Sequence, residues 1–331
     1  MNRQILLAQR PQGDLDSSDF TLVQGADPVL SDGQILIRNA FLSMDPAIRG
    51  WMSAGASYVR PIEVGAVIRS AVIGEVLESR HLDFEPGDHW VGLGGWEQLS
   101  AVDPRMGRKI PPMPLPLSTS LGVLGGNGLT AWFGMHDVGR PQAGDTVVVS
   151  AAAGGVGSIA GQLAKRLGCT VIGIVGSDEK ARWITEDLGF DAAINRRTEP
   201  VYAALKAFPK VDVYFDNVGG PILDDVLARI AVGARVVICG AISQINAAEL
   251  PPGPKNYIRL LTQRASMRGF VTLDFAPRWQ EASTALAELV ISGDLVHREH
   301  IIDGLENAPD ALAGMFRGDN LGKLMIRLAP G

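Results

Sequence analysis

The chain has little cysteine, few aromatic residues and no excess of positive charge. It has two cysteines, Cys169 and Cys239, and aromatic residues make up 6% of its 331 residues. Two thiols are too few for a disulfide framework or a cysteine-rich zinc lobe. Lysine and arginine number 30 against 36 aspartates and glutamates, so the net charge is −6. Nucleic acids and anionic membranes bind basic surfaces, and we therefore expect neither as a partner.

A long uninterrupted hydrophobic run is also missing. The uncharged stretch 146–164 contains four glycines and is followed by Lys165 and Arg166. It is typical of a buried strand, a tight turn and a buried helix rather than a membrane span. The N-terminal sequence MNRQILLAQRP lacks the apolar core of a signal peptide. We expect a cytoplasmic protein with reduced thiols.

The pattern of residues changes near the proline-rich run 111–118, which predicts two domains. Before it, short strand-like runs alternate with turn residues; in Gln34–Leu42 the pattern places Ile35, Ile37 and Phe41 on one face. After it, strands alternate with helices, which is typical of βαβ units and a parallel sheet. The predicted strands are Thr146–Val149, Thr170–Val175, Val211–Phe215, Arg235–Ile238 and Lys323–Leu328, and the predicted helices are Val156–Leu167, Glu179–Leu188, Ile222–Ile230 and Trp279–Ser292.

Glycine is plentiful, and three glycines form a recognisable turn. Gly154, Gly155 and Gly157 follow the buried strand that ends at Ser150, and a helix begins directly after them. Such glycines permit a tight turn and the close approach of a pyrophosphate to the exposed N–H groups of a helix N-terminus. Ala152 stands where the dinucleotide fingerprint has its first glycine. A closely packed turn without a ligand is the alternative, but the surrounding βαβ units favour dinucleotide binding.

The end of the second strand favours NADPH over NADH. Enzymes that use NAD usually have an acid there for the ribose 2′-hydroxyl, whereas this chain has Gly176 and Ser177. Lys180 follows within reach of a 2′-phosphate, and Arg196 with Arg197 adds positive charge after the third strand. Asp178 and Glu179 oppose this interpretation unless they serve as helix-capping and first-turn residues.

Motifs spread over nearly the whole chain carry a more specific signal. They are LSMDPAIRG (Leu42–Gly50), GLTAWFG (Gly128–Gly134), SAAAGGVGS (Ser150–Ser158), GSDEK (Gly176–Lys180), FDNVGG (Phe215–Gly220), CGAIS (Cys239–Ser243), LPPGPKNY (Leu250–Tyr257), GFV (Gly269–Val271) and GDNLGK (Gly318–Lys323). In this order they resemble the zinc-independent branch of the medium-chain dehydrogenase/reductase superfamily. Within it, the chain is similar to the prostaglandin reductase, leukotriene 12-hydroxydehydrogenase and alkenal or curcumin reductase group.

The resemblance implies an α/β fold. A mostly β, barrel-like (GroES-like) catalytic domain would comprise 1–120 and 296–331, and a Rossmann domain with a doubly wound parallel sheet would comprise 121–295. It also implies NADPH as cofactor and a homodimer. The implied cofactor-binding residues are Thr130, Ala153, Gly154, Val156, Gly157, Ser177, Lys180, Arg196, Asn217, Cys239, Gly240, Ala241, Ile242, Ser243, Phe270, Val271 and Asn320.

The chain departs from the family pattern at two positions near the expected substrate. Ala47 replaces a tyrosine of the family, and Thr262 stands where some members have a proposed catalytic tyrosine. The bacterial-type pattern places its tyrosine earlier, which corresponds to Tyr257. We expect Tyr257 to donate a hydrogen bond to the substrate, with a packing role as the alternative. The candidate walls of the substrate pocket are Met44, Trp51 and Tyr58.

No set of metal ligands is evident, and His297 with His300 is the only close histidine pair. Without a metal to polarise an alcohol, the reaction that remains is hydride transfer to an activated acceptor such as an α,β-unsaturated ketone or aldehyde. We therefore expect an NADPH-dependent enone or enal reductase with a small-molecule substrate. The alternatives are a zinc-free quinone reductase and an NADPH-binding protein with little turnover.

Overall fold

The computed structural model describes residues 1–54, 59–247, 249 and 251–328. The chain forms two compact units. The first unit comprises Met1–Leu121, Glu299–Asn320 and the segment from Leu324 onward, and the second comprises Gly122–Arg298 and Leu321–Lys323. The sequence placed the boundaries at 120/121 and 295/296. It did not anticipate that the three residues Leu321–Lys323 join the second unit.

The first unit is built on antiparallel strands. β1 (Asn2–Leu7) pairs with β2 (Phe20–Gly25), and a larger sheet has the order β14-β15-β3-β4-β5-β7, with β6 paired to β3. Its main core includes the fully buried Trp90 and Trp96. The strands of the larger sheet are β3 (Ile35–Ser43), β4 (Arg69–Ser79), β5 (His89–Gly95), β6 (Leu99–Val102), β7 (Gly107–Lys109), β14 (Glu299–Asp303) and β15 (Lys323–Arg327). The unit also holds α1 (Pro46–Trp51) and α9 (Ala308–Arg317).

One prediction about β3 is wrong. Ile35 and Ile37 pack in the main core of the first unit, but Phe41 packs against a separate cluster around Ile73 and Met325. The pairing of β3 with β4 shifts register between Asn39 and Phe41. An irregularity of this kind reverses the alternation of side chains. Phe41 therefore faces away from Ile35 and Ile37.

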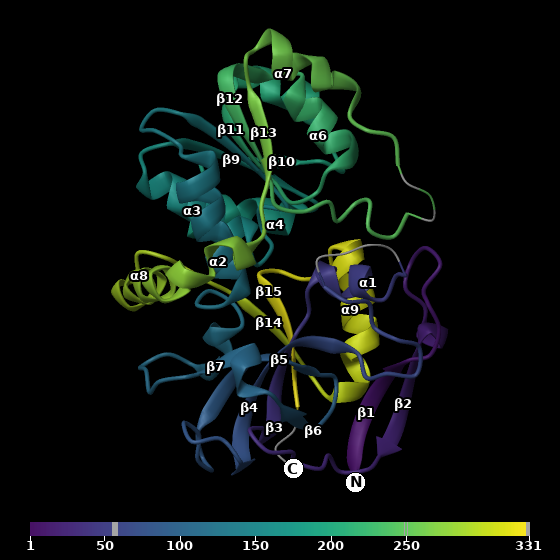
Figure 1. The fold of residues 1–331 in the computed structure, drawn as a ribbon. Helices are drawn as coiled ribbons and strands as arrows, with labels where there is room; N and C mark the ends of the chain where they lie inside the picture. The colour runs from purple at the N-terminus through teal and green to yellow at the C-terminus, as the bar shows by residue number, and fades with distance from the viewer. Residues whose placement is uncertain (55–58, 248, 250, 329–331) are drawn as a thin grey trace. The chain divides into compact units, whose positions relative to one another are not determined.

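The second unit contains a six-stranded parallel sheet with the order β10-β9-β8-β11-β12-β13 (Figure 1). This is the doubly wound Rossmann order: β9 and β10 are added on one side of β8, and β11, β12 and β13 on the other. The α/β fold predicted from the sequence is thus confirmed. The strands are β8 (Thr146–Ser150), β9 (Thr170–Val175), β10 (Ala192–Asn195), β11 (Val211–Asp216), β12 (Ile230–Ile238) and β13 (Ser266–Gly269).

Helices cover both faces of this sheet (Figure 1). On one side lie α2 (Gly126–Phe133) and α3 (Gly157–Arg166), and on the other lie α5 (Val201–Ala204) and α6 (Gly220–Leu227). The predicted helix Ile222–Ile230 was misplaced: α6 ends at Leu227, and Ile230 is the first residue of β12. The remaining helices are α4 (Asp178–Arg182), α7 (Ile258–Thr262) and α8 (Trp279–Ser292). Among the described residues, no helix is long and apolar enough to cross a membrane.

A buried glutamine links α3 by hydrogen bonds to the segment that follows α8. Gln162 is 5% exposed. Its amide nitrogen donates to the carbonyl oxygens of Ser158 at 2.9 Å and Val296 at 2.8 Å, and its amide oxygen accepts from the Val296 N–H at 2.8 Å. The two bonds to Val296 satisfy both polar groups of one backbone residue.

We expect Gln162→Leu to lower the free energy of unfolding by about 1–3 kcal/mol, because it leaves the polar backbone of Val296 without partners. Urea denaturation monitored by fluorescence measures the effect. Gln280→Leu is the matched control, since Gln280 is exposed and bonds only to Thr284 among the described residues; its change should stay within about 0.5 kcal/mol. Equal effects of the two substitutions would show that the hydrogen bonds of Gln162 to Val296 do not stabilise the fold.

Candidate functional site

The glycine turn after β8 has the geometry of an anion-binding site. Ala151 has a left-handed backbone with φ 48°, and its carbonyl oxygen accepts from the Gly154 N–H at 2.9 Å. A Cβ on Gly157 would overlap that carbonyl oxygen and lie 2.9 Å from Cα of Ala152. No side chain caps the start of α3 at Val156. The N–H groups of Ser158 and Ile159 donate to the carbonyl oxygens of Gly154 and Val156, whereas those of Val156 and Gly157 have no hydrogen-bond partner among the described residues. These two N–H groups can bind a phosphate, which suits the pyrophosphate of a dinucleotide.

A segment that is distant in the sequence contacts this turn through its backbone. The Gly322 N–H donates to the Ala153 carbonyl oxygen at 2.9 Å, and Gly322 forms an isolated parallel bridge with Gly154. Gly322 has φ +75°, and a Cβ there would overlap the carbonyl oxygen of Arg298. Asn320 of the same motif was assigned to the cofactor from the sequence, but the role of Gly322 was missed. Its presence in GDNLGK was the only available signal.

Basic side chains gather where β9 and β10 end. A Cβ built on Gly176 would lie 3.8 Å from Nη2 of Arg196 and 3.8 Å from Nε of Arg197. Ser177 is the N-cap of α4, and its hydroxyl accepts from the Lys180 N–H at 3.3 Å. Asp178 and Glu179 lie in the first turn, so Ser177 rather than Asp178 caps the helix. The charge at this edge suits the 2′-phosphate of NADPH.

The ends of β11 and β12 form a second pair of turns beside the glycine turn. Oδ1 of Asp216 accepts from the hydroxyls of Ser150 and Tyr214 and from the N–H groups of Val218 and Gly219, at 2.7–3.0 Å. Asn217 is held to Ser150 through its backbone N–H and its side-chain amide. These bonds place Asn217 at the edge where β8 also ends.

The turn Cys239–Ser243 packs on the turn after β11. The Ile242 N–H donates to the Asn217 carbonyl oxygen at 3.2 Å, and the Ser243 hydroxyl donates to the Val218 carbonyl oxygen at 2.6 Å. Burial, with the Asp216 carboxylate nearby, raises the pKa of the Cys239 thiol to about 12. The thiol is therefore neutral near pH 7 and unsuited to nucleophilic catalysis.

Three more of the residues that the resemblance assigns to the cofactor also lie in the second unit. Thr130 is in α2, and its hydroxyl donates to the Gly126 carbonyl oxygen at 2.7 Å. Phe270 and Val271 follow β13, and the Phe270 ring meets Phe275 edge to face at a centroid distance of 6.3 Å. Phe270 belongs to an aromatic cluster with Phe133. Its ring is thereby held on the α2 side of the unit.

The candidate substrate residues differ widely in exposure. Tyr257 is 62% exposed, and its hydroxyl has no hydrogen-bond partner among the described residues. Met44 is 1% exposed and belongs to the core of the first unit, and Trp51 packs against the same core. Tyr58 lies outside the described residues. Of this set, the structure leaves Tyr257 most accessible to a ligand.

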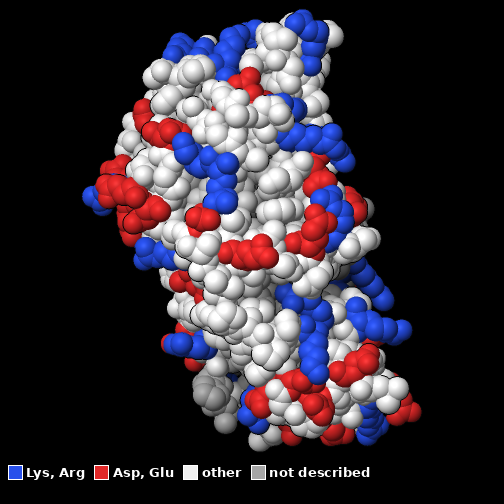
Figure 2. Space-filling view, turned by 90° about the vertical axis from the view of Figure 1, so that its left-hand side faces the viewer, with Lys and Arg blue, Asp and Glu red and all other residues white. Residues whose placement is uncertain are grey.

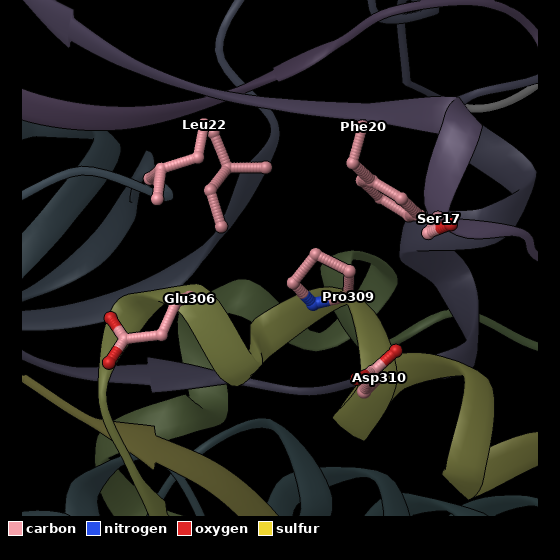
Figure 3. Close-up of a pocket in the computed structure, with 7 residues that line it drawn as sticks. Ser17, Phe20, Leu22, Glu306, Pro309 and Asp310 are labelled. Carbon is pink, nitrogen blue, oxygen red and sulfur yellow. The ribbon is translucent and has the colours of Figure 1, made fainter.

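Two cavities lie within the first unit. One of about 200 Å³ is lined by Phe20 and Leu22 on one side and by Glu306, Pro309 and Asp310 on the other (Figure 3). None of the predicted site residues lines it. The second, of about 210 Å³, lies along α9 and β14 and includes Asn320. Of these two cavities, the second includes a residue that the sequence assigned to the cofactor and the first does not.

The charged side chains on the surface are mixed in sign. On the face shown in Figure 2, acidic and basic side chains are interspersed, and neither sign covers it continuously.

Cys169 is buried, and desolvation raises its thiol pKa to about 11. Within the part of the chain that the structure describes, no three His, Cys, Asp or Glu side chains form a group able to hold a metal ion.

Comparisons with known proteins cover the full length. Residues 3–110 match the model described as the N-terminal domain of oxidoreductase, and residues 155–289 match the one described as zinc-binding dehydrogenase. The chain is 40% identical to the NADPH-dependent curcumin reductase of Escherichia coli, covering 99% of this chain and 97% of the relative. It is 37% identical to the NADP⁺-dependent 2-alkenal reductase of Nicotiana tabacum, covering 99% and 98%.

A solved structure agrees in fold. CurA of Vibrio vulnificus in complex with NADPH matches with a TM-score of 0.94 and 38% identity, over 99% of this chain and 100% of that one. The Rossmann strand order, the glycine turn and the ordered motifs all point the same way as these similarities. The chain belongs to the medium-chain dehydrogenase/reductase superfamily, in the group of the prostaglandin, alkenal and curcumin reductases.

Proposed function

We propose that this protein is an NADPH-dependent reductase of the conjugated carbon–carbon double bond in α,β-unsaturated ketones or aldehydes, and that it works without a metal ion. The observation that carries the proposal is the combination, in one Rossmann unit, of an uncapped glycine turn and a basic edge at Ser177, Lys180 and Arg196. Full-length relatives named as curcumin and 2-alkenal reductases support the choice of substrate class.

In this reaction the protein has two tasks: it orients the substrate against the cofactor, and it provides one hydrogen-bond donor to the carbonyl oxygen. NADPH, when bound, would supply the hydride that adds to the β-carbon of the substrate. Negative charge then collects on the carbonyl oxygen, and a donor placed there stabilises the transition state. Tyr257 is the proposed donor, because its side chain is exposed and its hydroxyl has no hydrogen-bond partner among the described residues. Solvent can supply the proton for the α-carbon.

We expect Tyr257→Phe to lower kcat more than it raises KM, because the hydrogen bond strengthens as charge develops. Loss of one such donor costs about 10²–10³ in kcat in well-studied enzymes, and we expect about tenfold because water replaces an exposed hydroxyl. Steady-state kinetics with a simple enone measures this. Tyr202→Phe is the control, since Tyr202 lies in α5 beside Lys206. An unchanged kcat in Tyr257→Phe would make Tyr257 a wall residue.

The proposed function is tested by NADPH oxidation with matched panels of enones, enals and quinones, before and after dialysis against a strong chelator. We expect turnover with enones and enals, and no loss after chelation. Turnover restricted to quinones would replace the proposal with a quinone reductase. Absence of turnover with every acceptor would indicate a cofactor-binding protein. Activity lost with stoichiometric zinc would refute the metal-free mechanism.

We propose further that two copies associate through β13. This strand is an edge of the sheet in the described part of the chain, and all four of its residues are exposed. Met267 on β13 and Leu261 on α7 are exposed apolar side chains. Unpaired edges with apolar flanks are suited to pairing. Light scattering should give twice 35.2 kDa, and Met267→Asp should shift the protein toward monomer. A wild-type monomer at micromolar concentration would refute this.

A further inference from the structure

Asn195 joins the two elements that form the basic edge of the cofactor site. It is the last residue of β10 and is 8% exposed. Its amide nitrogen donates to Oδ1 of Asp178 at 2.7 Å, and its amide oxygen accepts from the Arg197 N–H at 3.1 Å. Its carbonyl oxygen accepts from the N–H groups of Thr198 and Glu199. One side chain thus connects the first turn of α4 to the turn that carries the arginines.

The bond to Asp178 affects the charge balance at this edge. Asp178 directly follows Ser177, close to the position where NAD-dependent enzymes place the acid that binds the ribose 2′-hydroxyl. A carboxylate free to turn toward that position would repel a 2′-phosphate and accept a hydrogen bond from a 2′-hydroxyl. The amide of Asn195 instead holds this carboxylate against the end of β10. The other charged side chains here are Glu179, Lys180, Arg196 and Arg197.

We propose that Asn195 is a positioning residue for cofactor choice: it restrains the Asp178 carboxylate, so that the edge accepts a 2′-phosphate rather than a 2′-hydroxyl. This inference rests on the cofactor subsite of the proposed function and adds the residue that controls its selectivity. It also explains how a chain with an acid beside the subsite retains a preference for NADPH.

The test is a double-mutant cycle on cofactor binding, measured without substrate as dissociation constants for NADPH and NADH. Asn195→Ala releases the carboxylate and should lower the preference for NADPH about 5- to 20-fold, as expected for a unit charge some 5 Å from a phosphate in a hydrated site. Asp178→Asn alone should leave the preference within about threefold of wild type. The double variant N195A/D178N should recover it to the same level, because the released side chain is then neutral.

A variant with the residues at 178 and 195 exchanged distinguishes release of the carboxylate from a general disruption of the turn after β10. In N195D/D178N the hydrogen bond is retained with donor and acceptor exchanged, the net charge is that of the wild type, and residue 195 still offers an acceptor to the Arg197 N–H. Its preference for NADPH should lie within about threefold of wild type. Thermal unfolding of every variant shows whether the fold is retained.

Three results would overturn the inference. They are an Asn195→Ala preference within twofold of wild type, a loss that persists unchanged in N195A/D178N, and an N195D/D178N variant as impaired as Asn195→Ala. The second would show that Asn195 acts only through the backbone of the turn. A protein that passes this test but reduces no enone would refute the proposed function and leave the role of Asn195 intact.

Discussion

Gly157→Ala is expected to weaken NADPH binding about 30- to 300-fold. The added Cβ would overlap the Ala151 carbonyl oxygen and lie 2.9 Å from Cα of Ala152. Both neighbours are backbone atoms, so the clash is relieved only by moving the turn away from the start of α3. The N–H groups that take the pyrophosphate then lose their alignment, at a cost of about 2–3.5 kcal/mol, which corresponds to the stated factor. Titration of cofactor fluorescence measures the loss.

Gly154→Ala provides the matched control within the same turn. A Cβ at this position meets a single atom within 4 Å, the Ala151 carbonyl oxygen at 3.2 Å, and a shift of a few tenths of an ångström relieves it. We expect less than a tenfold loss of affinity. If the two substitutions weakened NADPH equally, the specific fit of Gly157 against Ala151 and Ala152 would not be what shapes the site.

Lys180→Ala is expected to weaken NADPH binding about 10- to 100-fold and NADH binding much less. A charged hydrogen bond is worth about 1.5–3 kcal/mol, and only NADPH has the phosphate that receives it. Lys206→Ala, which removes a lysine packed over the Tyr202 ring of the same unit, should leave both affinities unchanged. Equal losses of NADPH and NADH in Lys180→Ala would show that this lysine does not bind the 2′-phosphate.

Local sequence patterns predicted the alternation of strands and helices in the second unit, and the bounds of some of the elements. The strand Thr170–Val175 and the helix Trp279–Ser292 have the predicted bounds, because uniform apolar runs and helical periodicity act over short distances. The glycine turn was identified for the same reason. Phe41 was assigned to the wrong face because a register shift depends on the partner strand, which the sequence of β3 alone does not reveal.

The parts of the site that were missed depend on contacts between distant segments. Gly322 supports Ala153 across more than half of the chain, and a lone glycine gives no sign of such a partner. The bond from Asn195 to Asp178 depends on how β10 lies beside the start of α4. Sequence spacing identified the charges of this edge but not the restraint that orients one of them. Such long-range contacts require the folded structure.

The most direct test of the proposed reaction is the position of the transferred hydrogen. An enone is reduced with NADPH deuterated at C4 of the nicotinamide, on the face from which this enzyme transfers, and the product is examined by NMR. We expect a saturated ketone that carries deuterium at the β-carbon. Deuterium at the carbonyl carbon of an unsaturated alcohol would contradict it, because the protein would then be a carbonyl reductase.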